Sequence, residues 1–246
     1  MCYVPMGRLD YPLLEELVEA ALLLKPMEHM YVRAQYWEGL SEAERVLHCA
    51  RALQRMHPDW VFASMTAALV WGLAVPEECI WPVRLATTRA SSGHGNDTLL
   101  RQAVGTDKSC VVNRFRVTSL GRTVLDCLRE LEFEDGLVLA DSALALGKLT
   151  HDELVELLEE CRNTTRGGLH AVEIAKHAKG YTGECSRLHA RIVMLGYEVP
   201  EQLDGAWFGL EGAELAAALD AAGVPRVPGG FALEYPDAWH PKSLNR

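Results

Sequence analysis

Three charged side chains lie within two apolar helical segments, and charge in such a place needs a partner. Arg122 and Asp126 are four residues apart, which puts them one turn apart on the same face of a helix. Asp141 stands between Ala140 and Ser142 in the next helical segment, where an unpaired carboxylate would be costly to bury. The chemistry that this pattern favours is internal bracing by ion pairs and hydrogen bonds.

Arginine dominates the basic residues in the middle of the chain. Residues 33–129 contain 12 Lys plus Arg and 9 Asp plus Glu, which gives a formal charge of +3. Residues 130–246 contain 10 Lys plus Arg and 20 Asp plus Glu, which gives a formal charge of −10. A guanidinium group suits phosphate oxygens, which makes these side chains candidates for contacts with nucleic acid. The alternative is that most of them solvate helix faces. The arginines are Arg33, Arg45, Arg51, Arg55, Arg84, Arg89, Arg101, Arg114, Arg116, Arg122 and Arg129.

The sequence shows no recognisable set of metal ligands and no activated nucleophile. It has no Cys-x-x-Cys pair and no His-Glu-x-x-His helix. Cys185 and His189 are one helical turn apart, but two side chains do not close a zinc site. Cys127 lies in an apolar helical segment, a setting that disfavours a reactive thiolate. We therefore expect no metal, no cofactor and no catalytic residue.

Size and composition predict a globular cytoplasmic protein. The chain has 246 residues, 49% of them hydrophobic, which is enough for the core of one large or two smaller domains. No apolar run approaches the roughly 18 residues of a membrane span, and the first residues lack the basic and apolar regions of a signal peptide. We expect no membrane partner, and we expect the seven scattered cysteines to be free thiols.

Apolar spacing and capping signals predict the elements that must position these residues. A leucine-rich face predicts a helix over residues 12–24, ended by Lys25 and Pro26, and capping boxes at Ser41 and Thr150 predict the starts of two more helices. Further helices are predicted at 64–71, after Ser119, around Asp141, and at 169–178, 184–195 and 212–222.

Residues 80–88 and 110–118 are predicted to be strands of a small mixed sheet, and 99–103 one short helix. The preferred fold is therefore α+β and helix-rich. Within the second strand Arg114 and Arg116 are two residues apart, which predicts that both side chains emerge on one face. The residues that we single out as candidate DNA contacts are Arg84, Arg89, Arg114 and Arg116.

Four segments carry a family resemblance: MYVRAQYW, SMTAALVWGLAVP, VTSLGRTVLDC and ADSALALG, in that order over residues 28–165. With these segments the chain resembles the actinobacterial branch of the AbiEi-like type IV antitoxin and transcriptional-regulator family. The resemblance implies a regulator that binds its own operator and opposes a cognate nucleotidyltransferase toxin. It also implies that Arg122, Thr123, Asp126 and Asp141 are structural signature residues.

The resemblance divides the chain into three predicted parts. Residues 1–60 would be a helical region with a winged-helix-like remnant, because only about 30 residues precede MYVRAQYW. That is too short for a complete winged module, so the DNA-binding half is expected to be shortened or absent. Residues 61–180 would be the antitoxin-like α+β core, and residues 181–246 an incomplete nuclease-like region.

The nuclease-like region supplies the main alternative function. Many relatives carry a C-terminal domain similar to restriction and very-short-patch-repair endonucleases, and Glu184 matches the start of such a domain. A metal-dependent endonuclease would use Glu184, Asp204 and Glu234, but Asp204 precedes a glycine and Glu234 precedes Tyr235 and Pro236, which disrupt a strand. We therefore expect a non-enzymatic regulator, with an endonuclease or an inactive family relic as the alternatives.

Overall fold

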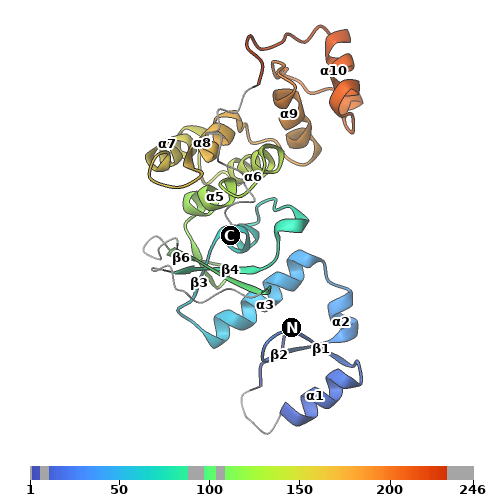
Figure 1. The fold of residues 1–246 in the computed structure, drawn as a ribbon, viewed down its shortest axis with the longest axis vertical. Coiled ribbons are helices and arrows are strands. Elements are labelled where there is room, and N and C mark those ends of the chain that lie inside the picture. The colour runs from blue at the N-terminus through green and yellow to red at the C-terminus, as the bar shows by residue number, and fades with distance from the viewer. Residues whose placement is uncertain (1, 6–10, 88–96, 104–108, 232–246) are drawn as a thin grey trace. The chain divides into compact units, whose positions relative to one another are not determined.

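The computed structural model shows the predicted α+β fold, in which many helices accompany small sheets. It describes residues 2–5, 11–87, 97–103 and 109–231. Figure 1 labels the elements in chain order.

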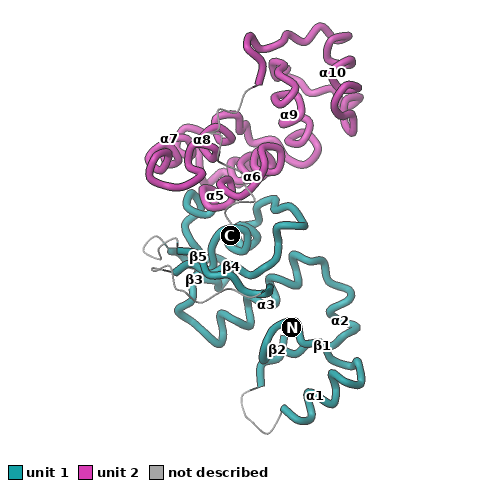
Figure 2. Tube along the Cα trace, in the orientation of Figure 1, with its two compact units in different colours: residues 1–123 teal, residues 124–246 magenta. Residues whose placement is uncertain are grey.

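The chain forms two compact units, residues 1–123 and residues 124–246, which Figure 2 shows in different colours. The boundary between them lies inside helix α5 (Leu120–Leu128). This subdivision is coarser than the three predicted parts, which stay a prediction.

The first unit opens with a helix and a β-hairpin rather than with one long helix. Helix α1 (Tyr11–Glu19) is followed by strands β1 (Leu23–Met27) and β2 (Met30–Arg33), which pair antiparallel. The prediction that Lys25 and Pro26 end a helix over 12–24 is wrong, because both residues lie in β1. An edge strand tolerates proline, since its outward N–H has no partner to lose.

A five-stranded mixed sheet forms the centre of the first unit, in the order β5-β4-β3-β7-β6. Strand β3 pairs antiparallel with β4 and parallel with β7, while β4 and β5 are parallel and β6 and β7 antiparallel. The strands are β3 (Val61–Phe62), β4 (Val83–Thr87), β5 (Leu99–Ala103), β6 (Ser109–Val112) and β7 (Phe115–Thr118).

Two strand predictions are corrected by this sheet. Residues 99–103 form strand β5 rather than a short helix, because they pair along their whole length with β4. Residues 110–118 form a hairpin rather than one strand, because the chain turns at Asn113 and Arg114, whose φ values are 49° and 67°. Positive φ at both central residues is the requirement of a type I′ two-residue hairpin turn.

Helices α2 (Ala34–Glu38), α3 (Glu42–Met56) and α4 (Ser64–Trp71) complete the first unit, with a short 3₁₀ turn at Glu77–Cys79. The predicted capping box at Ser41 is confirmed: its hydroxyl accepts from the Glu44 N–H, and the Glu44 carboxylate accepts from the Ser41 N–H. Phe62, Leu85 and Val117 are buried in a common core with apolar residues of α3 and α4.

The second unit is helical over the residues that the structure describes. Helix α6 packs against α8 and α9, and α7 packs against α8. The capping box at Thr150 is confirmed, since Thr150 accepts from the Glu153 N–H at the start of α7. Its remaining helices are α6 (Phe133–Ala145), α7 (His151–Cys161), α8 (Gly168–His177), α9 (Glu184–Met194) and α10 (Gly212–Ala221), with a 3₁₀ turn at Gly205–Trp207.

Candidate nucleic-acid interface

The β6–β7 hairpin is held against α3 by an arginine. Arg51 Nη1 donates to the backbone carbonyl oxygen of Asn113 at 3.0 Å, and the Arg51 guanidinium lies 4.0 Å from the centre of the Phe115 ring. Phe115 is itself a buried core residue. These contacts fix the turn of the hairpin, and with it Arg114, beside the C-terminal half of α3.

The side-chain amide of Gln54 joins two further segments, the loop after α3 and strand β7. Its Nε2 atom lies 3.2, 2.9 and 3.3 Å from the carbonyl oxygens of His57, Pro58 and Trp60, and its Oε1 atom accepts from the Arg116 N–H at 2.7 Å. A primary amide can fill this role because it carries donors and an acceptor on one group. Gln54 therefore fixes the loop after α3 relative to strand β7.

An aromatic pair lies on this loop. The rings of His57 and Trp60 stack with their centres 3.8 Å apart and their planes 14° apart. Arg101, from strand β5, has its guanidinium 5.7 Å from the Trp60 ring centre, within cation–π distance. Arg101 therefore lies beside the loop after α3, although its strand β5 is not adjacent to β3 in the sheet.

We call Arg51, Arg55, Arg101, Arg114 and Arg116 the arginine surface. Arg55, Arg101, Arg114 and Arg116 are exposed, and Arg51 is half-buried. Arg116 lies 3.7 Å from the carboxylate of Asp59, whose side chain is 98% exposed, so this ion pair is weak. Within the described part of the chain, the Arg55 and Arg114 guanidinium groups form no ion pair or hydrogen bond. They are therefore free to bind an anion.

The four predicted DNA contacts have different outcomes. Arg84 is only 5% exposed, and its Nη1 atom donates to the Cys79 carbonyl oxygen at 2.8 Å, so it braces the interior and is withdrawn as a phosphate contact. Arg89 lies outside the described residues. Arg114 and Arg116 belong to one hairpin, but Arg114 occupies the turn, so the predicted alternation along a single strand is wrong.

The arginine surface includes three residues that were not singled out from the sequence. Arg51 and Arg55 are four residues apart on α3, and this i, i+4 spacing was a usable signal that both emerge on one face. Arg101 carried no such signal, because its position depends on strand pairing between β4 and β5.

The predicted signature residues brace the interior. Thr123 is buried and its hydroxyl oxygen lies 2.8 Å from that of Thr118, also buried. Asp126 is 1% exposed and lies 3.4 Å from Nη1 of Arg129, the residue that directly follows α5. Arg122 is half-buried in α5. The structure thus brings Asp126 to Arg129, an ion partner that the sequence interpretation did not name.

Asp141 has the partners that its burial requires. Its Oδ1 atom accepts from the N–H groups of Lys179 and Gly180 at 2.6 and 2.8 Å, and the Ser186 hydroxyl donates to Oδ2. His189 Nδ1 lies 3.7 Å from Oδ2. One carboxylate thus ties helix α6 to the loop before α9 and to α9 itself.

The residues of the alternative endonuclease do not form a site in the described part of the chain. Glu184 is exposed at the first position of α9, and the Asp204 carboxylate caps the 3₁₀ turn by accepting from the Ala206 N–H at 2.9 Å. Glu234 lies outside the described residues. Over the described ranges, no three His, Cys, Asp or Glu side chains are grouped to hold a metal ion. The seven cysteines are free thiols.

Comparison with known proteins places the chain in no family. No family model matches it, and no curated protein matches it. Among solved structures, the RV2827C protein from Mycobacterium tuberculosis shares 12% identity and a TM-score of 0.40, covering 88% of this chain and 84% of that one. A likeness at this level carries no conclusion about this chain. None of the helices described here is long and apolar enough to cross a membrane.

Proposed function

We propose that the chain is a non-enzymatic regulator of the type IV antitoxin class that binds DNA through its arginine surface. The observation that carries the DNA half of the proposal is the convergence of five arginines from α3, β5 and the β6–β7 hairpin. Residues 1–123 contain 13 Lys plus Arg and 13 Asp plus Glu, so this gathering of arginines is not a consequence of an overall basic unit.

Phosphate is the anion that the arginine surface fits best. The guanidinium fork stays charged at any physiological pH and donates to two phosphate oxygens at once. Arg55 and Arg114 have no competing carboxylate in the described structure, so binding costs them no existing ion pair. These contacts would position the protein on the DNA backbone and would not by themselves read a sequence.

The antitoxin half of the proposal rests on the four resembling segments and on the charge of the second unit. Residues 124–246 contain 11 Lys plus Arg and 21 Asp plus Glu, a formal charge of −10. Such a unit is repelled by DNA and attracts a basic protein surface, which suits contacts with a cognate nucleotidyltransferase toxin. We place this activity in the cytoplasm, a reducing compartment in which free thiols persist.

Fluorescence-anisotropy titration of the full chain against the DNA upstream of its own gene tests the proposal. One phosphate contact from each of the four exposed arginines, Arg55, Arg101, Arg114 and Arg116, predicts that binding weakens on the order of a hundredfold between about 50 mM and about 200 mM salt. Binding that is absent at the lower salt, or that does not respond to salt, would remove the DNA half. A parallel incubation with Mg²⁺ and plasmid is expected to leave the plasmid intact, and cleavage would favour the endonuclease alternative instead.

A further inference from the structure

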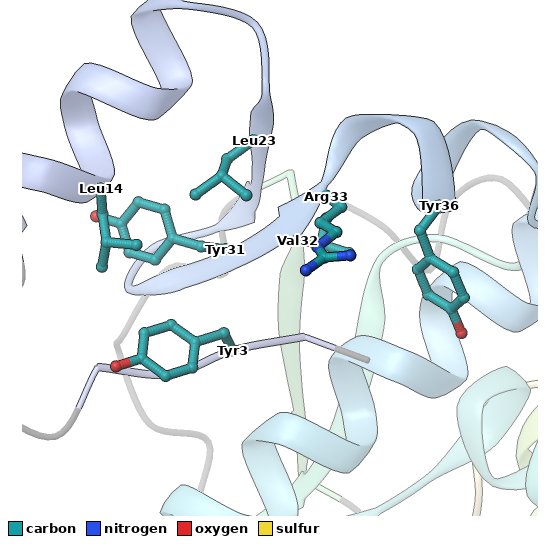
Figure 3. Close-up of a pocket in the computed structure, with 7 residues that line it drawn as sticks. All are labelled: Tyr3, Leu14, Leu23, Tyr31, Val32, Arg33 and Tyr36. Atoms are coloured by element: carbon teal, nitrogen blue, oxygen red, sulfur yellow. The ribbon is translucent and has the colours of Figure 1, made fainter.

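A pocket of about 460 Å³ opens on the N-terminal part of the first unit, away from the residues of the arginine surface. Figure 3 shows its walls, which come from the N-terminal segment, α1, both strands of the first hairpin and α2. The volume lies in the range of small-molecule sites. The lining residues are Tyr3, Leu14, Leu23, Tyr31, Val32, Arg33 and Tyr36.

Hydrogen bonds hold the walls of this pocket in place. Tyr3 and Tyr31 exchange two backbone hydrogen bonds of 2.7 and 2.9 Å, which add the N-terminal segment to the edge of β2. The Tyr31 hydroxyl donates to Glu15 Oε1 at 2.6 Å, and Lys25 Nζ lies 2.9 Å from the same oxygen. Helix α1 is thereby tied to both strands, so the protein's own contacts hold the walls of the pocket together.

Most of the polar groups around the pocket have partners within the protein, but the Arg33 guanidinium has none among the described residues. Glu15 and Lys25 neutralise each other, and the Tyr36 hydroxyl is hydrogen-bonded to His48 Nε2 at 2.8 Å. The guanidinium of Arg33 is exposed and has neither an ion pair nor a hydrogen bond among the described residues. In Figure 3 it lies between the Tyr3 and Tyr31 rings on one side and Tyr36 on the other. The pocket thus combines an apolar, aromatic lining with one unpaired cation.

We propose that this pocket binds a small aromatic carboxylic acid, with the ring among the tyrosines and leucines and the carboxylate on Arg33. A single arginine matches a monoanion, and its two parallel donors match the two oxygens of a carboxylate. A phosphate dianion would leave one charge uncompensated against an apolar lining. A neutral aromatic compound would fill the same space and leave Arg33 without a partner. Binding of a ligand in this pocket is separate from the proposed DNA binding and does not depend on it.

Ligand-observed NMR titration of the full chain with 3-phenylpropionate tests the site, with 3-phenylpropionamide as the neutral isostere. We expect saturable binding of the acid and about tenfold weaker binding of the amide. Arg33→Gln is expected to lower the affinity for the acid about tenfold and to leave the amide unchanged, because only the charge contact is removed. Arg162→Gln, which removes an arginine of α7's C-terminal end, is the control and should bind the acid as the parent chain does.

A second pair of variants tests where the ring binds. Leu14 lines the pocket, whereas its neighbour Leu13 does not and is 61% exposed. Leu14→Trp should fill the pocket and abolish binding of both compounds, while Leu13→Trp should leave both unchanged. The proposal is overturned if the parent chain does not bind the acid saturably, if Arg33→Gln binds it as tightly as the parent, or if the two tryptophan variants behave alike.

Discussion

The guanidinium of Arg51 donates to the backbone carbonyl oxygen of Asn113 across 62 positions of the sequence. Together with the hydrogen bond from the Arg116 N–H to Gln54 Oε1, it holds the β6–β7 hairpin against helix α3. Because Arg114 follows Asn113 and Arg55 lies one turn beyond Arg51, these contacts bring two exposed, unpaired cations of the described structure to one region. The proposed DNA contact depends on this closure.

Replacing Asp141 should destabilise the second unit. Asp141→Asn is expected to lower the free energy of unfolding by about 2 kcal/mol, because a neutral amide accepts more weakly from Lys179, Gly180 and Ser186 and sets an N–H₂ group against one of these donors. Urea unfolding followed by circular dichroism measures the change. Asp152→Asn is the matched control, since that side chain is fully exposed. Equal unfolding midpoints for the two variants would contradict a bracing role.

Acid should destabilise the chain through His170. Burial lowers the pKa of His170 to about 4, against an ordinary 6.5, and its Nε2–H donates to the Leu131 carbonyl oxygen at 2.8 Å. The folded state therefore binds fewer protons than the unfolded state between these values. The stability that this pKa difference gives to the folded state is fully present above pH 6.5 and is lost as the pH falls toward 4.

The loss from this histidine between about pH 7 and about pH 5 is about 2 kcal/mol. His170→Gln keeps a donor but cannot titrate, so the stability difference between the two pH values should shrink by that amount in urea titrations. His151→Gln, at a half-exposed histidine, is the control for the substitution itself. An unaltered pH dependence in His170→Gln would show that the pKa of this histidine is the same in the folded and unfolded states.

The turn between α7 and α8 requires glycine at position 168. A Cβ atom there would lie 2.5 Å from the Cys161 carbonyl oxygen and 2.7 Å from that of Arg162, both of them backbone atoms that cannot move aside. Gly168→Ala should therefore cost about 2 kcal/mol of unfolding free energy. Gly39→Ala is the control, because its Cβ would meet nothing nearer than 3.7 Å. Similar melting temperatures for the two variants would refute the close approach.

Local capping signals predicted the helix ends that depend on neighbouring residues alone. The capping boxes at Ser41 and Thr150 satisfy free N–H groups within four residues, so they depend only on residues that are close in the sequence. Both predictions were confirmed. Gly72 ends α4 with a φ of 83°, the left-handed conformation that glycine commonly supplies after the last turn of a helix. The sequence predicted that a buried Asp141 needs hydrogen-bond partners, but it did not predict which residues these partners are.

Non-local pairing explains the errors. Leu99–Ala103 has residues that suit a helix, and only its ladder with β4 makes it a strand. The turn at Asn113 and Arg114 lacks the glycine that usually marks such a hairpin, so one strand was predicted in place of two. Arg84 alternates with the core residues Val83 and Leu85, a pattern typical of an exposed face, yet that face is buried here.

Only part of the arginine surface could be predicted from the sequence. The sequence identified arginine as the relevant residue type and included Arg51, Arg55 and Arg101 in the set. Which of them gather depended on Gln54 and on the hairpin turn, contacts that join positions 62 residues apart. Periodicity within one element does not report such contacts.

The salt dependence of DNA binding by an Arg55→Gln/Arg114→Gln double variant tests the central claim most directly. The slope of log K against log salt concentration should fall in magnitude by about 2 relative to the parent chain, since each phosphate contact contributes about 0.9. Arg162→Gln should keep the parent slope. A double variant that also keeps the parent slope would show that the arginine surface does not touch the phosphate backbone.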